Sequence, residues 1–233
     1  VIDQDTLFYR EVSSDADAEQ AIAGNSFPRM LYMRYEGLTN FKLFKWLYQQ
    51  GLVDCSTTKF EDMKVPDALL RSYRDLLKEA QLMPATTLVF DGSCTKRWVN
   101  AICAFRNMHL ITDQSVEMLK GELLQLLDEL EEIAVAGQFR SGKPVSIYIS
   151  DMDIEATYCY VAARHYRASC IEAFSINSLR SADPGMFEHV RRWITSLSRF
   201  ATLVSCSGEL QRIHFFKRQR AIVAELEREG LEP

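Results

Sequence analysis

The chain has 233 residues, of which 47% are hydrophobic and 25% are charged, and its formal net charge at pH 7 is −5. This mixture is typical of one packed globular domain and excludes a disordered tail, and the chain is long enough to bury a core without disulfide or metal support. The negative charge argues against broad nonspecific binding to nucleic acid, because affinity for phosphates comes from clustered cations, although a local basic groove is still allowed.

We expect no membrane span, no signal peptide and no cysteine-based zinc site in this chain. No stretch approaches the ~20 apolar residues that a membrane-spanning helix needs, and the first ten residues contain no apolar run of the signal-peptide kind. We therefore expect an intracellular protein, cytoplasmic or nuclear, with no membrane partner. Six cysteines are scattered without a Cys-x-x-Cys pair, which predicts free thiols instead of zinc ligands or a disulfide framework.

Hydrophobic periodicity divides the first half of the chain into alternating strands and helices. In chain order, the predicted elements are an N-terminal extension at residues 1–27, a strand at 29–35, a helix at 40–50, an amphipathic helix at 69–80, a buried strand at 86–90 and a helix at 96–107. The strand 86–90 reads TTLVF, an apolar and β-branched run that is typical of a strand buried on both faces.

The second half of the chain continues this alternation. In chain order, the predicted elements are a helix at 113–133, a strand at 145–149, a helix at 151–163, a strand at 170–174, a helix at 187–200, candidate strands at 202–206 and 212–216, and a charged helix at 217–229. Strands that alternate with helices imply βαβ units. We therefore expect an α/β domain at residues 28–216, with a mostly parallel twisted sheet and helices on both faces, and a C-terminal charged helix at 217–233.

Acidic residues follow three of the predicted strands. They are Glu36, Asp91 and the group Asp151, Asp153 and Glu155. Sites in open parallel sheets gather beyond the carboxyl ends of the strands, and carboxylates are the ligands that Mg²⁺ and Mn²⁺ prefer. Two such ions ~4 Å apart can cleave a phosphodiester. Each acid taken alone also suits a turn or a helix cap, so a metal site requires that the three strand ends converge.

Two segments resemble the PIN-like nuclease domain of the flap endonuclease and XPG family. Residues 67–97, DALLRSYRDLLKEAQLMPATTLVFDGSCTKR, are similar to its helix, its x-x-P step and its strand ending in V-F-D-G before basic residues. Residues 148–179, YISDMDIEATYCYVAARHYRASCIEAFSINSL, are similar to its internal motif, in which two acids one residue apart precede Ala and a helix. The resemblance implies a PIN-like three-layer architecture.

The resemblance also implies a role for each matching residue. The catalytic residues would be Asp91, Asp153, Glu155 and Glu36. The ligands of Mg²⁺ or Mn²⁺ would be Asp91, Asp153 and Glu155, with Asp151 as a further candidate. The residues that bind nucleic acid would be Lys96, Arg97 and Arg106, which fall where the family's basic arch holds the scissile phosphate.

The sequence departs from this family at the second metal site. Where the family has a further pair of aspartates, this chain has Ser175 and Asn177, which bind Mg²⁺ weakly and add no negative charge. The glycine-rich helix-hairpin-helix is also missing after residue 180. The pattern is closer to degenerate relatives, namely the Asteroid-type proteins and the Mkt-type post-transcriptional regulators. We therefore expect a catalytically impaired scaffold or adaptor in RNA regulation, which binds proteins and, among nucleic acids, RNA.

Other interpretations stay open at this stage. The domain could be an active nuclease that uses Mg²⁺ or Mn²⁺ to cleave DNA or RNA, or an unrelated Rossmann-like domain for protein interactions. Residues 91–95 (DGSCT) also resemble the metal motif of von Willebrand A domains. A basic cluster follows Phe215-Phe216 and could bind single-stranded RNA, although these two residues suit a core strand better. Its cations are Lys217, Arg218 and Arg220.

Overall fold

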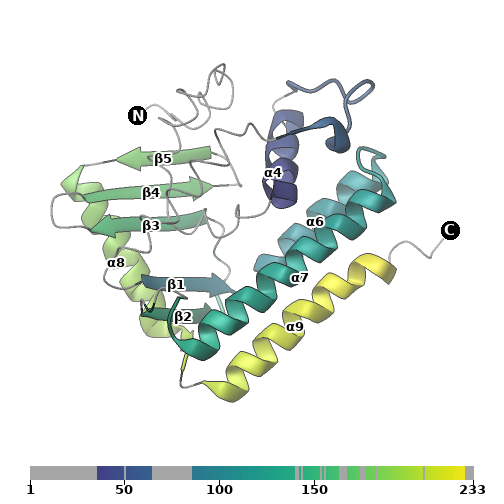
Figure 1. Cartoon of the computed structure of the whole chain (residues 1–233). Helices are drawn as coiled ribbons and strands as arrows, with labels where there is room; N and C mark the ends of the chain where they lie inside the picture. Colours follow the sequence, from purple (N-terminus) through teal and green to yellow (C-terminus); the bar gives the residue numbers. More distant parts are fainter. Residues whose placement is uncertain are drawn as a thin grey trace.

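The computed structural model describes residues 36–49, 51–64, 86–139, 142, 144–152, 154, 156–162, 167–173, 177–181, 183–206 and 208–228. These residues form a mixed α/β structure (Figure 1). Its helices are α4 (Glu36–Gln49), the short 3-10 helix η1 (Phe60–Asp62), α6 (Cys94–Asn107), α7 (Asp113–Ala136), α8 (Pro184–Phe200) and α9 (Glu209–Arg228). Its strands are β1 (Thr86–Asp91), β2 (Val145–Ser150), β3 (Ala156–Ala162), β4 (Arg167–Ala173), β5 (Asn177–Ser181) and β6 (Thr202–Leu203).

The strands form two separate three-stranded sheets. In the first, in the order β1-β2-β6, β1 and β2 are parallel along their whole length, and β6 pairs with β2 in the antiparallel direction. In the second, β3, β4 and β5 follow one another as antiparallel neighbours. The predicted α/β class is confirmed, but within the described residues the parallel arrangement holds only between β1 and β2.

The helix predicted at residues 151–163 is wrong, because residues 156–162 form strand β3. The segment reads ATYCYVA, in which β-branched and aromatic residues prefer a strand. Its pairing with β4 supplies a hydrogen-bonded partner that the helical interpretation overlooked. The strand predicted at 170–174 lies largely within β4 and is confirmed. The strand predicted at 29–35 and the helix predicted at 69–80 lie outside the described residues.

The strand predicted at 212–216 is also wrong, because these residues belong to helix α9. The buried positions of α9 recur three or four residues apart, as on one side of a helix, and they are Arg212, Phe216, Gln219, Ile222, Val223 and Leu226. Helix α9 therefore runs through the domain boundary that we expected between residues 216 and 217. It packs against α6 and α7 and is an integral part of the domain (Figure 1).

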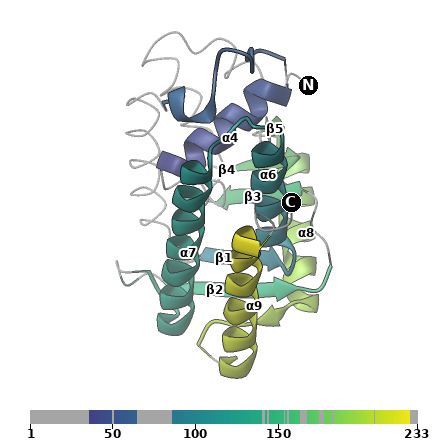
Figure 2. The ribbon, with the colours of Figure 1, turned by 90° about the vertical axis from the view of Figure 1, so that its right-hand side faces the viewer.

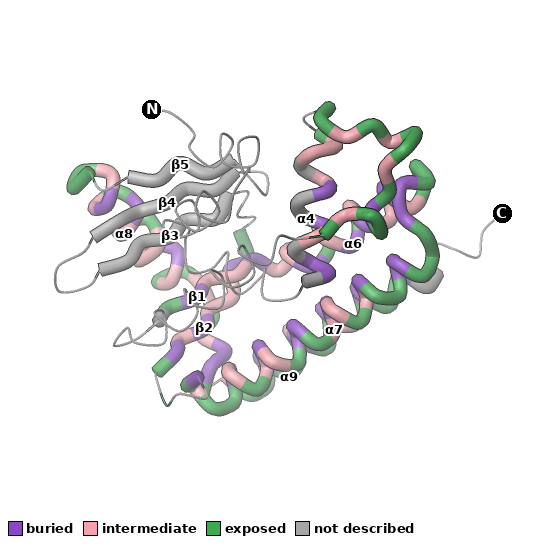
Figure 3. The backbone as a smooth tube through the Cα atoms, turned by 45° about the horizontal axis from the view of Figure 1, so that its top comes forward, coloured by how far each residue is buried: buried purple, intermediate pink, exposed green. Residues whose placement is uncertain are grey.

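The core lies between these helices and the first sheet. Helix α7 contributes a stripe of leucines, which is buried at Leu119, Leu123, Leu126, Leu127 and Leu130. Buried and exposed positions alternate along α7 in Figure 3. Helix α8 packs against both sheets and lies on the other side of the strands from α7 (Figure 2). None of the described helices combines the length and the apolar character needed to cross a bilayer.

Candidate functional site

Asp91 lies at the carboxyl end of β1, where the sequence predicted a site. Its register partner at the end of β2 is Ser150, so the ends of the two parallel strands meet, as expected. The turn Asp91-Gly92-Ser93 leads directly into α6, which begins at Cys94. The side chain of Asp91 is only 2% exposed. A buried carboxylate needs partners for its negative charge.

Arg97 is the main partner of this carboxylate. Its two terminal nitrogens bind both carboxylate oxygens, with Nη2 at 2.7 Å from Oδ2 and Nη1 at 3.1 Å from Oδ1. This two-point pairing is the strongest kind of arginine–carboxylate contact. The guanidinium also donates to Ser93 Oγ at 2.8 Å. Arg97 is one helical turn into α6, so the start of this helix delivers the cation to the strand end.

Three further hydrogen bonds complete the shell around Asp91. The backbone N–H and the hydroxyl of Ser93 donate to Oδ1 at 2.9 and 2.8 Å. The backbone N–H of Ile154, in the loop after β2, donates to Oδ2 at 3.1 Å. Burial by itself would raise the pKa of Asp91, but the hydrogen bonds and charge of Arg97, together with those from Ser93 and Ile154, lower it below its usual value. Asp91 is therefore a stably ionised side chain.

This arrangement does not fit a metal ligand. A carboxylate has about four lone-pair sites, and Asp91 accepts five hydrogen bonds from described residues. Mg²⁺ binds oxygen directly at about 2.0–2.1 Å, so the ion would have to displace Arg97. Within the described ranges, no three His, Cys, Asp or Glu side chains are grouped so that they could hold a metal ion.

The structure brings one of the other predicted acidic segments to Asp91. The hydrogen bond from Ile154 places the loop after β2 over the carboxylate. Asp151 in this loop is exposed, whereas Asp153 and Glu155 lie outside the described residues. Glu36 is the first residue of helix α4. The strand predicted before it, at residues 29–35, lies outside the described residues, so the place of Glu36 at a strand end stays a prediction.

The three cations that we expected to bind phosphate are in different situations. Arg97 binds Asp91 as described above. Arg106, at the end of α6, pairs with Asp113 at the start of α7, with Nη2 at 2.7 Å from Oδ1. Lys96 is exposed. Two of the three predicted cations thus bind carboxylates of the chain itself.

Sequence reasoning missed Gln219, which ties helix α9 to the turn after β1. Its side chain is completely buried, and Nε2 donates to the carbonyl oxygen of Gly92 at 3.2 Å. Its Oε1 atom is buried and has no hydrogen-bond partner among the residues that the structure describes. Its place on the buried side of α9, three residues from Phe216 and four from Val223, would have indicated burial once the helix had been extended to residue 209.

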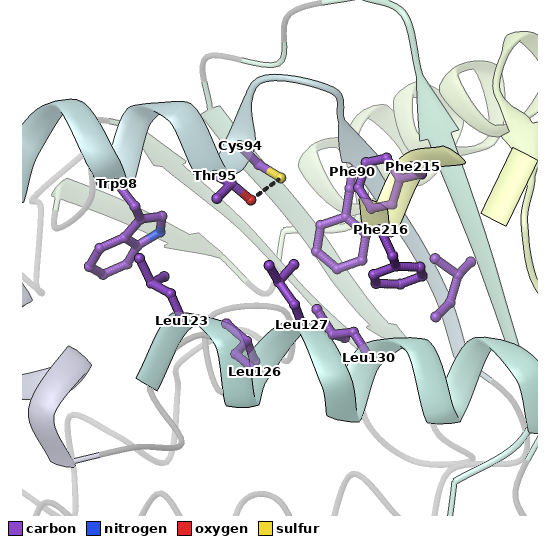
Figure 4. Close-up of a pocket in the computed structure, with 11 residues that line it drawn as sticks. Phe90, Cys94, Thr95, Trp98, Leu123, Leu126, Leu127, Leu130, Phe215 and Phe216 are labelled. Atoms are coloured by element: carbon purple, nitrogen blue, oxygen red, sulfur yellow. Dashed lines mark hydrogen bonds between the residues drawn. The ribbon is translucent and has the colours of Figure 1, made fainter. Parts of the chain in front are cut away.

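A small apolar cavity lies behind this turn (Figure 4). Leucines of α7 line one side, Phe215 and Phe216 of α9 line another, and side chains of α6, β1 and β2 complete it. The cavity measures about 20 Å³, which is room for at most one water molecule. It is a packing gap in the core and is too small to bind a substrate.

Comparisons of the chain with protein-family models, with curated proteins and with solved structures found no match. What the chain does is therefore inferred from its own residues.

Proposed function

We propose that this chain is a catalytically impaired α/β domain that acts as a scaffold or adaptor in RNA regulation. The ion pair between Asp91 and Arg97 carries the proposal. A metal-dependent nuclease needs a strand-end carboxylate that is open to a cation, whereas this carboxylate is buried and already neutralised by an arginine of the same chain.

We propose a distant PIN-like ancestry for the domain. Strand β1, the turn Asp91-Gly92 and the start of α6 agree with the part of the first segment, residues 67–97, that the structure describes. The second segment gives weaker support, because β3 stands where the resemblance implied a helix. The ancestry therefore depends mainly on residues 67–97 and on the placement of Asp91 at the sheet edge. A three-layer PIN-like architecture remains part of this proposal.

An active nuclease that uses Mg²⁺ or Mn²⁺ is the second candidate function. The hydrogen bond from Ile154 to Asp91 favours it, because Ile154 stands between Asp153 and Glu155 in the sequence. If Arg97, whose side chain is 49% exposed, moved away, Asp91 could join those acids around an ion. Cleavage of flap or single-stranded substrates with Mn²⁺ separates the two functions.

The decisive experiment compares the wild-type chain with Arg97→Gln and with the matched variant Arg106→Gln. Arg106 also makes one ion pair from α6, but with an exposed acid. We expect no Mn²⁺-dependent cleavage and no stoichiometric Mn²⁺ binding by calorimetry in all three proteins. Cleavage by the wild type that disappears in Asp91→Asn would overturn the proposal. Mn²⁺ binding gained only in Arg97→Gln would show that the arginine blocks a competent metal site.

The role in RNA regulation needs its own test, in which the chain is tethered to a reporter messenger RNA. An adaptor changes reporter output once it is held on the RNA, whatever its own affinity for RNA. We expect such a change, and we expect it to persist in Asp153→Asn and Glu155→Gln. An unchanged reporter would contradict the adaptor role.

A further inference from the structure

Helix α8 has one exposed side that combines cations and aromatic rings. Residues three, four and seven positions apart share one side of a helix, and the exposed residues of this side are His189, Arg192, Trp193, Ser196, Arg199 and Phe200, with His189 first. We call this surface the α8 outer face. The opposite side of α8 is buried at Phe187, Val190 and Leu197 and packs against the strands.

The α8 outer face repeats one two-residue unit. Arg192-Trp193 recurs seven residues later as Arg199-Phe200, which places the two units about 10.5 Å apart along the helix. Phe200 is 83% exposed and Trp193 is 38% exposed. One exposed aromatic residue is ordinary on a protein surface. Two of them, each next to an arginine at the same spacing, form a pattern that suits a partner with repeating units.

The positive charge of this face suits an anionic partner. None of its six residues is a carboxylate, and the side chain of Arg192 is 78% exposed. The neighbouring Glu188 is held mainly by Arg191, with Nη2 at 2.7 Å from Oε2, while Arg192 Nε lies 3.8 Å from that oxygen. Among the described residues, Arg199 makes no ion pair. The two arginines of the repeat are thus available to phosphates.

We propose that the α8 outer face binds single-stranded nucleic acid, with phosphates on Arg192 and Arg199 and bases stacked on Trp193 and Phe200. Proteins that bind single strands combine cations along the backbone with aromatic rings under successive bases. This binding surface deepens the proposed function and rests on it only for the choice of RNA over DNA. It lies on helix α8, whereas Asp91 ends strand β1, and it involves none of the residues around that carboxylate.

A membrane surface suits this face less well. An interfacial helix buries its apolar side among the lipids, but the apolar side of α8 is already buried against the strands. A protein partner could also use tryptophan and arginine as anchors. The repeated cation–ring unit favours a polymer of phosphates and bases. In the experiment below, binding to lipid vesicles would favour a membrane, and no binding of single strands would favour a protein partner.

The test measures binding of fluorescently labelled single-stranded RNA, single-stranded DNA and duplex RNA of about the same length by anisotropy, at several salt concentrations. The ring variant is Trp193→Ala with Phe200→Ala, and the charge variant is Arg192→Gln with Arg199→Gln. The matched control is Lys59→Gln with Lys64→Gln, which removes two exposed cations beside η1. Phe200→Trp is the conservative variant. Circular dichroism confirms that each variant is folded.

We expect the wild type to bind both single strands more tightly than the duplex. The ring variant should weaken binding at least 10-fold, because each stacked base contributes about 5- to 150-fold. The charge variant should lower the slope of log affinity against log salt by about 1.4, since each phosphate contact contributes about 0.7. The control should change binding less than 3-fold, and Phe200→Trp should preserve it.

Three results would overturn the proposal. The first is no binding of single strands by the wild type at low salt. The second is an equal loss in the control and in the two face variants. The third is binding to anionic lipid vesicles, or to duplex RNA, as tight as to single strands. Because a tethered reporter does not depend on RNA affinity, loss of this surface leaves that assay unchanged, and the failures of the two proposals can be told apart.

Discussion

The end of β1 and the outer face of α8 use the same residue type in opposite ways. At the strand end, Arg97 holds a carboxylate that is 2% exposed and completes its hydrogen-bond shell. On α8, Arg192 and Arg199 belong to an exposed face whose six residues include no carboxylate. The partner of a buried charge cannot leave it without a large loss of stability. An exposed cation loses little when it changes partner, so it can bind a ligand. Parallel sheets usually bind their ligands at the carboxyl ends of the strands. In this chain, that end is less accessible to a ligand than the α8 outer face.

Phe216 and Phe200 offer the largest expected contrast between the two regions. Phe216 is 1% exposed and lines the core cavity, so Phe216→Ala should lower the free energy of unfolding by about 3–5 kcal/mol. Phe200 is 83% exposed, so Phe200→Ala should change it by less than about 0.5 kcal/mol. Urea unfolding of both variants measures the difference. A stability loss in Phe200→Ala comparable to that of Phe216→Ala would show that the α8 outer face is covered in solution.

Asp91→Asn should have the next largest effect. The variant removes the charge that Arg97 and Ser93 stabilise. We expect the free energy of unfolding to fall by about 2 kcal/mol and not more, because Arg97 is half exposed and solvent weakens the ion pair. Asp113→Asn is the matched control, since its side chain is 80% exposed and also pairs with one arginine. It should cost less than about 0.5 kcal/mol. Equal losses in the two variants would contradict a structural role for Asp91.

Acidification should remove the contribution of Asp91. Because the pKa of Asp91 is lower in the folded chain than in the unfolded one, its contribution is present in full above about pH 4 and is lost as the pH falls through the folded value. The urea midpoints of wild type and Asp91→Asn should therefore converge below about pH 4. A difference that stays constant down to the acid transition would show that the ionised form is not the stabilising one.

Glu61 is expected to have a smaller effect. It accepts hydrogen bonds from the Thr112 N–H at 2.9 Å and the Ser115 hydroxyl at 2.8 Å, at the start of α7. Burial raises its pKa, but these hydrogen bonds outweigh burial and lower it. Glu61→Gln should lower the free energy of unfolding by about 0.5–1 kcal/mol. Glu117→Gln, on the exposed side of α7, is the control and should leave the free energy of unfolding unchanged within error.

The sequence allowed much of the first sheet and its helices to be predicted. The run TTLVF, the leucine stripe of α7 and the turn at Asp91-Gly92 are local signals that tertiary contacts reinforce. The helix predicted at 151–163 failed because the pairing of β3 with β4 is a nonlocal choice between two compatible patterns. The strand predicted at 212–216 is wrong because two adjacent aromatic residues suit a strand and a helix alike, and the helical spacing becomes clear only with the buried positions after Phe216.

The candidate site could be located from the sequence but its state could not. The position of Asp91 at a strand end follows from local pattern, and so does the proximity of the loop after β2. Whether a carboxylate meets a metal or an arginine depends on the side-chain direction of Arg97, one turn into α6. The α8 outer face was missed for a related reason, because the exposed side of a helix becomes clear only once its buried side is known.

The position of α9 in the chain has a consequence for synthesis on the ribosome. Helix α7 ends at Ala136, and the helix that covers its leucine stripe begins only at Glu209. At a translation rate of about 5–20 residues per second, the leucines of a nascent chain stay exposed for on the order of ten seconds before α9 is made. During that interval the growing polypeptide exposes a hydrophobic surface of the kind that chaperones bind during translation.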